Sequence, residues 1–203
     1  MDKEEIRKKF IDAAITIGAK QGVDAITMRS MSKHAGINTA YMYRCFDDVY
    51  EVQLQAFLLV NKLFVSNLLK HIQIFDDGQI SKERELQFFK NVWLDMKQEV
   101  DKFEFFLRYY YNYVFPKDYA SEESRKELQP LLQKIKPLFK EGTNLVRIML
   151  YLMDNLVKFA ITLNEENSTE KKDIDLEVYR FLYATIVPHL KNSIIETENE
   201  INI

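Results

Sequence analysis

The sequence predicts an all-α protein, in which an N-terminal three-helix domain with a helix-turn-helix precedes a larger helical domain. Three observations predict this class. The 203 residues include only five Gly and four Pro, and 47% are hydrophobic, so the chain has few helix breakers and enough apolar surface for a core. Apolar residues recur at three- and four-residue steps along most of the chain. Gly36 and Asn38 mark a turn between two short helical patterns.

The first predicted helix extends from about Lys3 to Lys20. Gly18 and Gly22 flank its end. One apolar stripe runs along it and is expected to complete the small N-terminal core: Ile6, Phe10, Ala13, Ala14 and Ile17.

The stretch from Ile26 to Phe46 is typical of two short helices joined by a tight turn. The Thr27 hydroxyl is placed to cap the first of them, because it can accept a hydrogen bond from a free amide of the first turn. Gly36 ends that helix, since glycine reaches left-handed dihedral angles without strain. Asn38 then opens a second helix of about residues 39–46.

The second helix of this hairpin has a polar and aromatic outer face. Met42 and Phe46 are four residues apart and are expected to pack inward. A short helix that exposes a hydroxyl, aromatic rings and a guanidinium suits the DNA major groove. An ordinary helical hairpin has the same turn signals, so the hairpin alone leaves both interpretations open. The outward residues are Thr39, Ala40, Tyr41, Tyr43 and Arg44.

A wider set of residues between Ile11 and Val52 has a specific spacing. It comprises Ala13-Ala14, Gly18, Gly22-Val23, Ile26-Thr27-x-Arg29, Lys33-x-Ala35-Gly36-Ile37 and Met42-Tyr43-x-x-Phe46. In residues and spacing this first quarter of the chain resembles the N-terminal domain of TetR-family transcriptional regulators. The resemblance implies a homodimeric repressor that binds a palindromic DNA operator and responds to a small molecule. Two positions depart from the family pattern: Cys45 replaces a frequent aromatic or His, and Ser32 replaces a usual Ala.

The candidate DNA contacts fall into two groups. Phosphate contacts are expected from Lys33, from the Thr27 hydroxyl at a helix start and, by the resemblance, from Tyr43. Contacts to base edges are expected from the outward N-terminal part of the second helix, namely Thr39, Ala40, Tyr41 and Arg44.

Charge supports this division of the chain. The formal net charge is −3, yet residues 1–46 hold eight Lys or Arg against five acidic residues, which gives them +3 and leaves −6 for the remainder. A basic N-terminal domain attracts phosphates, while an acidic remainder limits nonspecific binding.

Several other classes of protein lack support in the sequence. The single Cys, Cys45, excludes an intrachain disulfide and favours a reducing cytoplasmic location. No signal peptide or membrane span is expected. His34, His71 and His189 are far apart and lack a second ligand at metal spacing, and no catalytic or phosphate-binding motif is present. We therefore expect no metal, no cofactor and no enzyme activity.

A long helix over residues 47–72 is predicted to connect the domains, which we place at 1–48 and 49–203. Asp47-Asp48 can cap it, and apolar residues persist at helical spacing to about Ile72. By the family resemblance this helix transmits the ligand state.

The next segments predict a ligand pocket. Asp76-Asp77-Gly78 forms a loop, Ser81 caps a helix, and Asp101 to Phe115 is dense in aromatic residues until Pro116. Rings at helical spacing usually fill a core, but here they occur on every side of the helix. We expect a pocket for a largely apolar or flat ligand, whose polar end, an anionic one being an option, is fixed by Arg108 and Tyr hydroxyls. Its expected lining residues are Trp93, Phe106, Tyr109, Tyr110 and Tyr113.

The C-terminal third predicts a dimer interface. In the helix that starts at Ser121, Pro130 and Pro137 predict a kink or break. Residues 142–164 carry two adjacent apolar stripes, more than one packed side needs, and a final helix follows a polar loop at 164–172. Two such helices from each chain can form a four-helix interface. Its expected centre is Leu152, Leu156, Tyr183 and Ile186, and the tail from Glu196 is expected to fray.

Two alternatives stay open at this point. Besides a DNA-binding regulator, the protein could be a TetR-like protein that has lost DNA binding and acts as a protein-contact co-regulator, or a helical ligand-binding or enzymatic protein whose hairpin is incidental. A test of binding to promoter DNA distinguishes the first alternative from a DNA-binding regulator. Turnover of a substrate in metabolite screens would favour the second alternative.

Overall fold

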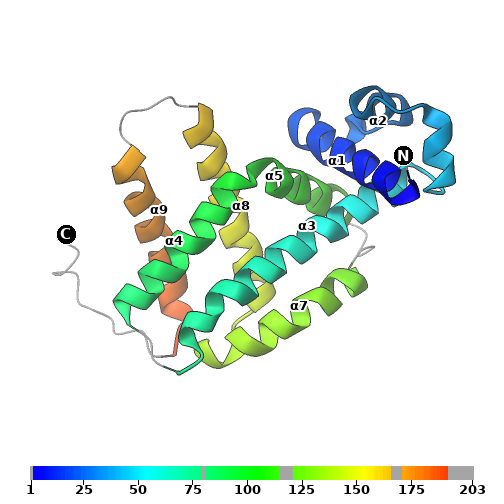
Figure 1. The fold of residues 1–203 in the computed structure, drawn as a ribbon. Helices are drawn as coiled ribbons and strands as arrows, with labels where there is room; N and C mark the ends of the chain where they lie inside the picture. The colour runs from blue at the N-terminus through cyan, green and yellow to red at the C-terminus, as the bar shows by residue number, and fades with distance from the viewer. Residues whose placement is uncertain (1, 79–80, 115–120, 166–170, 192–203) are drawn as a thin grey trace.

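The computed structural model describes residues 2–78, 81–114, 121–165 and 171–191, and it confirms the all-α class (Figure 1). Within these residues the only extended pairing is a single antiparallel bridge between Phe139 and Leu190. The helix end predicted at Pro116, the middle of the polar loop at 164–172 and the tail from Glu196 lie outside the described residues.

The N-terminal helices lie together at one end of the molecule, and we call residues 2–46 the head (Figure 1). They are α1 (Lys3–Gln21), the 3₁₀ turn η1 (Val23–Ala25), α2 (Met28–Ala35) and η2 (Thr39–Arg44). Asp2 caps α1 by accepting a hydrogen bond from the Glu5 amide at 2.7 Å. The stripe predicted on α1 is buried in all five positions.

Helix α3 (Val49–His71) runs from the head into the rest of the chain, which we call the body. It begins where expected, because the Asp48 carboxylate accepts from the Glu51 amide at 2.8 Å. By length and mean hydropathy, 1.3, the segment Val49–Phe75 is apolar enough to cross a membrane. In this fold α3 packs against α1, α4, α5 and α7, and its buried apolar side chains are part of the protein core.

The body contains α4 (Lys82–Gln98), α5 (Val100–Tyr109) with the π-helical turn η4 (Tyr110–Val114), α7 (Ser121–Ile135), α8 (Leu145–Glu165) and α9 (Lys171–Ile186). The 3₁₀ turns η3 (Ile72–Phe75), η5 (Lys136–Leu138) and η6 (Val187–His189) follow α3, α7 and α9. As predicted, Gly78 lies in a loop with φ of 74° and Ser81 caps α4, accepting from the Arg84 amide.

The two prolines of the segment 121–139 behave differently. Helix α7 continues through Pro130, whose side chain is exposed, so the carbonyl group that loses its helical bond lies at a solvent-facing surface. Pro137 does coincide with a break, because α7 ends at Ile135 and the 3₁₀ turn η5 follows.

Two clusters of buried residues hold the structure together. The larger one is continuous from α1 through α3 and α5 to α8 and α9, and thus joins head and body. The smaller one lies between α3 and α7, around Val65, Ile72, Leu131 and Ile135.

Candidate functional site

The first helix of the hairpin, α2, is fixed at both ends by the residues that predicted it. The Thr27 hydroxyl accepts from the Ser30 amide at 3.1 Å, and the Ser30 hydroxyl accepts from the Thr27 amide at 2.9 Å, which makes a capping box. At the other end Gly36 is left-handed, with φ of 66°, and the Ile37 amide donates to the Ser32 carbonyl at 3.1 Å. The turn is therefore rigid.

The second element of the hairpin is shorter and tighter than predicted. It is a 3₁₀ helix of six residues, η2, rather than an α-helix over residues 39–46. Asn38 opens it as expected, since its side chain accepts from the Ala40 amide at 2.9 Å. The amides of Cys45 and Phe46 both donate to the Met42 carbonyl, which ends the element early. A segment this short between two caps adopts the tighter winding readily.

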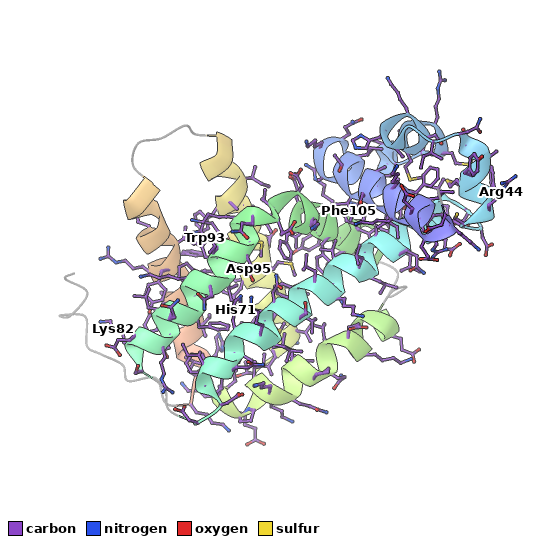
Figure 2. The ribbon with its side chains drawn as sticks, viewed as in Figure 1. Arg44, His71, Lys82, Trp93, Asp95 and Phe105 are labelled. Carbon is purple, nitrogen blue, oxygen red and sulfur yellow. The ribbon has the colours of Figure 1, made fainter. Side chains whose placement is uncertain are left out.

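The outer face of η2 carries the predicted base-edge side chains together with Tyr43, one of the phosphate candidates. Tyr43 is 59% exposed and Tyr41 41%, Ala40 and Arg44 are exposed, and Thr39 is half-buried. The Arg44 guanidinium carbon lies 5.1 Å from the centre of the Tyr41 ring, a cation–π distance. Figure 2 shows Arg44 at the outer edge of the head. These groups form one polar and aromatic surface with a positive charge.

The three phosphate candidates differ in how free their polar atoms are. Lys33 and Tyr43 are exposed, and their polar ends have no partner among the described residues. The Thr27 side chain is also exposed, but its hydroxyl takes part in the capping box and lies 3.0 Å from the Ser30 hydroxyl. Its first role is to hold α2 in place.

Cys45 points into the head instead of toward this surface. It is 6% exposed, and its sulfur lies 3.9 Å from the Lys3 carbonyl of α1. Arg7 of α1 donates to the Cys45 carbonyl and places its guanidinium carbon 4.5 Å from the centre of the Phe46 ring. The thiol thus helps to pack η2 on α1.

Head and body meet at α1 and α5, where Figure 2 labels Phe105. A Cβ atom on Gly18 would lie 2.5 Å from the Phe105 ring, so α1 and α5 approach each other as closely as glycine allows. The Tyr113 hydroxyl donates to the Asp24 carboxylate at 3.3 Å, and the side-chain amide of Gln53 in α3 donates to the Val23 carbonyl at 3.3 Å. These contacts tie the head to both α3 and α5.

The rings that predicted a ligand pocket belong largely to this junction. Phe57 of α3 stacks on Phe106 and Tyr109, with ring centres 4.7 Å and 5.0 Å apart. Trp93 is 2% exposed. Arg108 pairs with Glu104, one turn earlier on α5. The cavity described next is lined by none of the six predicted ligand residues, Trp93, Phe106, Arg108, Tyr109, Tyr110 and Tyr113.

A cavity of about 210 Å³ lies instead among α3, α4, α7, α8 and α9. Its lining is apolar apart from Glu85, Tyr179 and Tyr183. The Tyr179 hydroxyl is buried without a hydrogen-bond partner in the described part of the chain. Burial, with a further contribution from the charge of Glu85, raises the pKa of Tyr179 to about 12. Burial also raises the pKa of the Glu85 carboxyl.

Sequence reasoning missed Glu85 and Tyr179. The available signal was an acidic residue on the apolar side of α4, since Glu85, Phe89 and Val92 are spaced by four and three residues. The partner across the cavity, Tyr179, is on a helix that is distant in sequence.

The four residues predicted at the centre of a dimer interface line this cavity. Leu152 and Leu156 enter it from α8, and Tyr183 and Ile186 from α9. The two apolar stripes of α8 are both used within one chain, because α8 packs on α4 and α5 and also on α9. Other apolar side chains remain on the outer face of these two helices: Val146, Tyr151 and Phe181 are 36%, 48% and 40% exposed.

His71 has a structural partner. Its Nε2 lies 2.7 Å from an Asp95 carboxylate oxygen, which joins α3 to α4 (Figure 2). Among the described residues no group of three His, Cys, Asp or Glu side chains is arranged to hold a metal ion.

Solved structures share this fold, although neither a family model nor a curated protein matches the sequence. A TetR family transcription regulator from Marinobacter aquaeolei VT8 matches with a TM-score of 0.68 at 16% identity, over 90% of this chain and 95% of that chain. A TetR-family regulator from Haemophilus influenzae RD gives 0.57 at 18%, over 88% and 96%. SmeT, the repressor of the Stenotrophomonas maltophilia multidrug efflux pump SmeDEF, gives 0.53 at 15%, over 95% and 94%. The resemblance seen in the first quarter of the sequence thus extends to the whole architecture, and the chain has the fold of the TetR-family transcription regulators.

Proposed function

We propose that the protein is a cytoplasmic DNA-binding transcriptional regulator, a repressor that binds a palindromic operator as a homodimer and changes its DNA affinity when a small, largely apolar ligand binds. The observation that carries the proposal is the surface of η2. A rigid hairpin presents Tyr41, Tyr43 and Arg44 to solvent from a head with a net charge of +3 over residues 1–46.

The ligand-responsive part of the proposal is supported by the cavity and by the head–body junction. The cavity is lined by Phe64 and Leu68 of α3, and α3 also reaches the head through Gln53. A ligand that favours one position of α3 would therefore favour one position of the head.

The homodimer is supported by the apolar side chains on the outer face of α8 and α9. Large exposed apolar side chains that lie on neighbouring helices favour a protein interface. In a two-fold dimer the two heads would enter successive major grooves, so we expect half-sites about one helical turn apart or somewhat more.

The alternative of a protein-contact co-regulator without DNA binding rested on Cys45 and on the modest head charge. Cys45 is buried against α1, so it leaves the outer face of η2 intact. No feature of the structure now favours this alternative over the regulator.

Fluorescence anisotropy with labelled duplexes from the DNA upstream of the protein's own gene tests the proposal. We expect one duplex to bind more tightly than a scrambled duplex of equal length, with an affinity that falls as salt rises. Equal, salt-independent or undetectable binding to all upstream duplexes would contradict DNA binding and favour the co-regulator.

A further inference from the structure

We propose that the cavity binds a lipophilic amine, with the ammonium group held by Glu85 and Tyr179 and the hydrocarbon part enclosed by the apolar remainder. The inference deepens the proposed ligand-responsive function, on which it rests, by naming the chemical class of the ligand. It rests on three features of the cavity: its charge, its unpaired hydroxyl and its apolar volume.

Among the described residues, Glu85 is the one charged residue that lines the cavity. Its carboxylate makes no hydrogen bond or ion pair with any described residue. Two basic side chains beside cavity-lining residues are engaged elsewhere: Arg84 pairs with Asp77 at 2.5 Å, and Lys134 pairs with Asp76 at 2.7 Å. A carboxylate that is partly removed from water is stabilised by a cation, so an ammonium group would supply the missing partner.

Tyr179 supplies the second contact. Its hydroxyl oxygen is buried and has no hydrogen-bond partner among the residues that the structure describes. An ammonium group has three N–H donors, enough for Glu85 and Tyr179 together. The ring of Tyr179 lies 5.1 Å from that of Phe89 and 5.6 Å from that of Tyr183, measured between centres. Aromatic faces attract cations, so these rings favour the same group.

The remaining lining selects the rest of the ligand. It consists of Leu, Ile, Val, Met and Phe side chains, which favour an uninterrupted hydrocarbon. The volume of about 210 Å³ lies below the range of about 300–1,000 Å³ that is usual for drug-sized ligands, so a short chain fits best. A carboxylate ligand would face the like charge of Glu85, and a neutral one would leave that charge unpaired.

Titration calorimetry with octylamine, octanol and octanoic acid tests this assignment on the full chain without DNA. The three probes have the same chain length and differ in charge. We expect octylamine to bind most tightly and octanoate most weakly. Glu85→Gln should weaken octylamine binding by about ten- to hundredfold and leave octanol nearly unchanged, because the charged hydrogen bond is lost.

Two further variants make the test specific. Glu83→Gln is the matched control, since Glu83 is exposed on the same helix and does not line the cavity; it should leave all three affinities unchanged. Tyr179→Phe should weaken octylamine more than octanol. Leu152→Trp, which fills the cavity, should weaken both.

Octanoate binding more tightly than octylamine, or equal octylamine binding to wild type and Glu85→Gln, would overturn the assignment. The failure of the proposed function is a separate result. If octylamine binds as expected but leaves operator affinity unchanged in the anisotropy assay, the ligand response is wrong and the chemical class of the cavity stands.

Discussion

Tyr43 and Arg44 are neighbours in the chain and both face solvent, yet they are expected to serve different parts of DNA recognition. Tyr43→Phe removes the hydroxyl that is expected to contact a phosphate, so binding to all sequences should weaken alike. Arg44→Ala should also relax the preference at particular base pairs, by about 1–3 kcal/mol if the guanidinium is bidentate to a guanine. Anisotropy competition with single-substituted operators measures both effects.

Tyr111→Phe provides the control, because Tyr111 is 45% exposed but lies in the body. Equal losses from Tyr43→Phe and Tyr111→Phe would show that the hydroxyl of Tyr43 has no special role. If Arg44→Ala weakens binding to all substituted operators equally, Arg44 contacts a phosphate rather than a base edge.

Glu85 and Glu83 should respond to pH in opposite ways, although they are two residues apart. Burial raises the pKa of Glu85 above its ordinary value of 4.5, so its ionised form destabilises the ligand-free protein at neutral pH. Glu85→Gln should therefore raise the melting temperature at pH 7, and the gain should disappear as the pH falls toward 4.5.

The hydrogen bonds that Glu83 accepts from its own backbone amide and from Ser81 lower the pKa of its carboxyl, so its ionised form stabilises. Glu83→Gln should lower the melting temperature at pH 7 and lose this effect below pH 4.5. Calorimetric scans between pH 4 and pH 8 measure both variants. A fall in melting temperature for Glu85→Gln at pH 7 would show that the carboxylate has an internal partner.

At the scale of the elements, the closest contact lies between α1 and α5. Gly18→Ala would place a methyl group 2.5 Å from the Phe105 ring and 3.0 Å from Ile26. We expect the free energy of unfolding to fall by about 1–3 kcal/mol, as is usual for overpacking. Urea denaturation measures the loss.

The double variant Gly18→Ala with Phe105→Leu identifies the cause. If the clash with Phe105 is responsible, the two losses should combine to less than their sum, because the smaller side chain relieves the added methyl group. Strictly additive losses would place the cause elsewhere in α1.

Sequence patterns predicted the elements whose determinants are local. Thr27, Asn38, Asp48 and Ser81 all cap the helices assigned to them, because a cap depends only on a side chain and amides two or three residues away. The sequence did not predict that η2 is a 3₁₀ helix. The Met42 carbonyl accepts two hydrogen bonds that end the helix early, and these bonds do not change the spacing of the apolar residues from which a helix is predicted.

The sequence did not predict which residues line the cavity, for a different reason. Periodicity shows that α5 and α8 have more apolar surface than one face needs, but not which neighbour covers each face. The Phe57 ring of α3 stacks on the rings of Phe106 and Tyr109. The cavity is lined by residues of α4, α7 and α9, which are far apart in sequence. These are long-range contacts, which a helical period does not encode.

At the scale of the whole molecule, we expect the dimer to form through the exposed apolar side chains of α8 and α9, because the four residues first predicted for the interface line the cavity. Leu156 is 6% exposed, so Leu156→Arg would disrupt the body whatever the oligomeric state. Phe181→Arg is the appropriate change, because Phe181 is 40% exposed on α9. Light scattering should give about 48 kDa for wild type, twice the chain mass of 24.1 kDa, and about half of that for the variant.

Leu94→Arg serves as the matched control, since Leu94 is 52% exposed but on α4. The Leu94→Arg variant should remain dimeric. Dissociation by Leu94→Arg together with a dimeric Phe181→Arg would place the interface on α4.

The buried cluster that is continuous from α1 to α9 also bears on how the protein folds. The head shares its apolar interior with the body, because one buried cluster contains residues of both. We therefore expect unfolding to be a single cooperative event, and hydrogen exchange should show the slowest amides of α1 and α5 exchanging at similar rates. Substitutions at exposed positions of η2 should therefore cost little stability, whereas substitutions on the inner face of α1 should disturb its packing against the body.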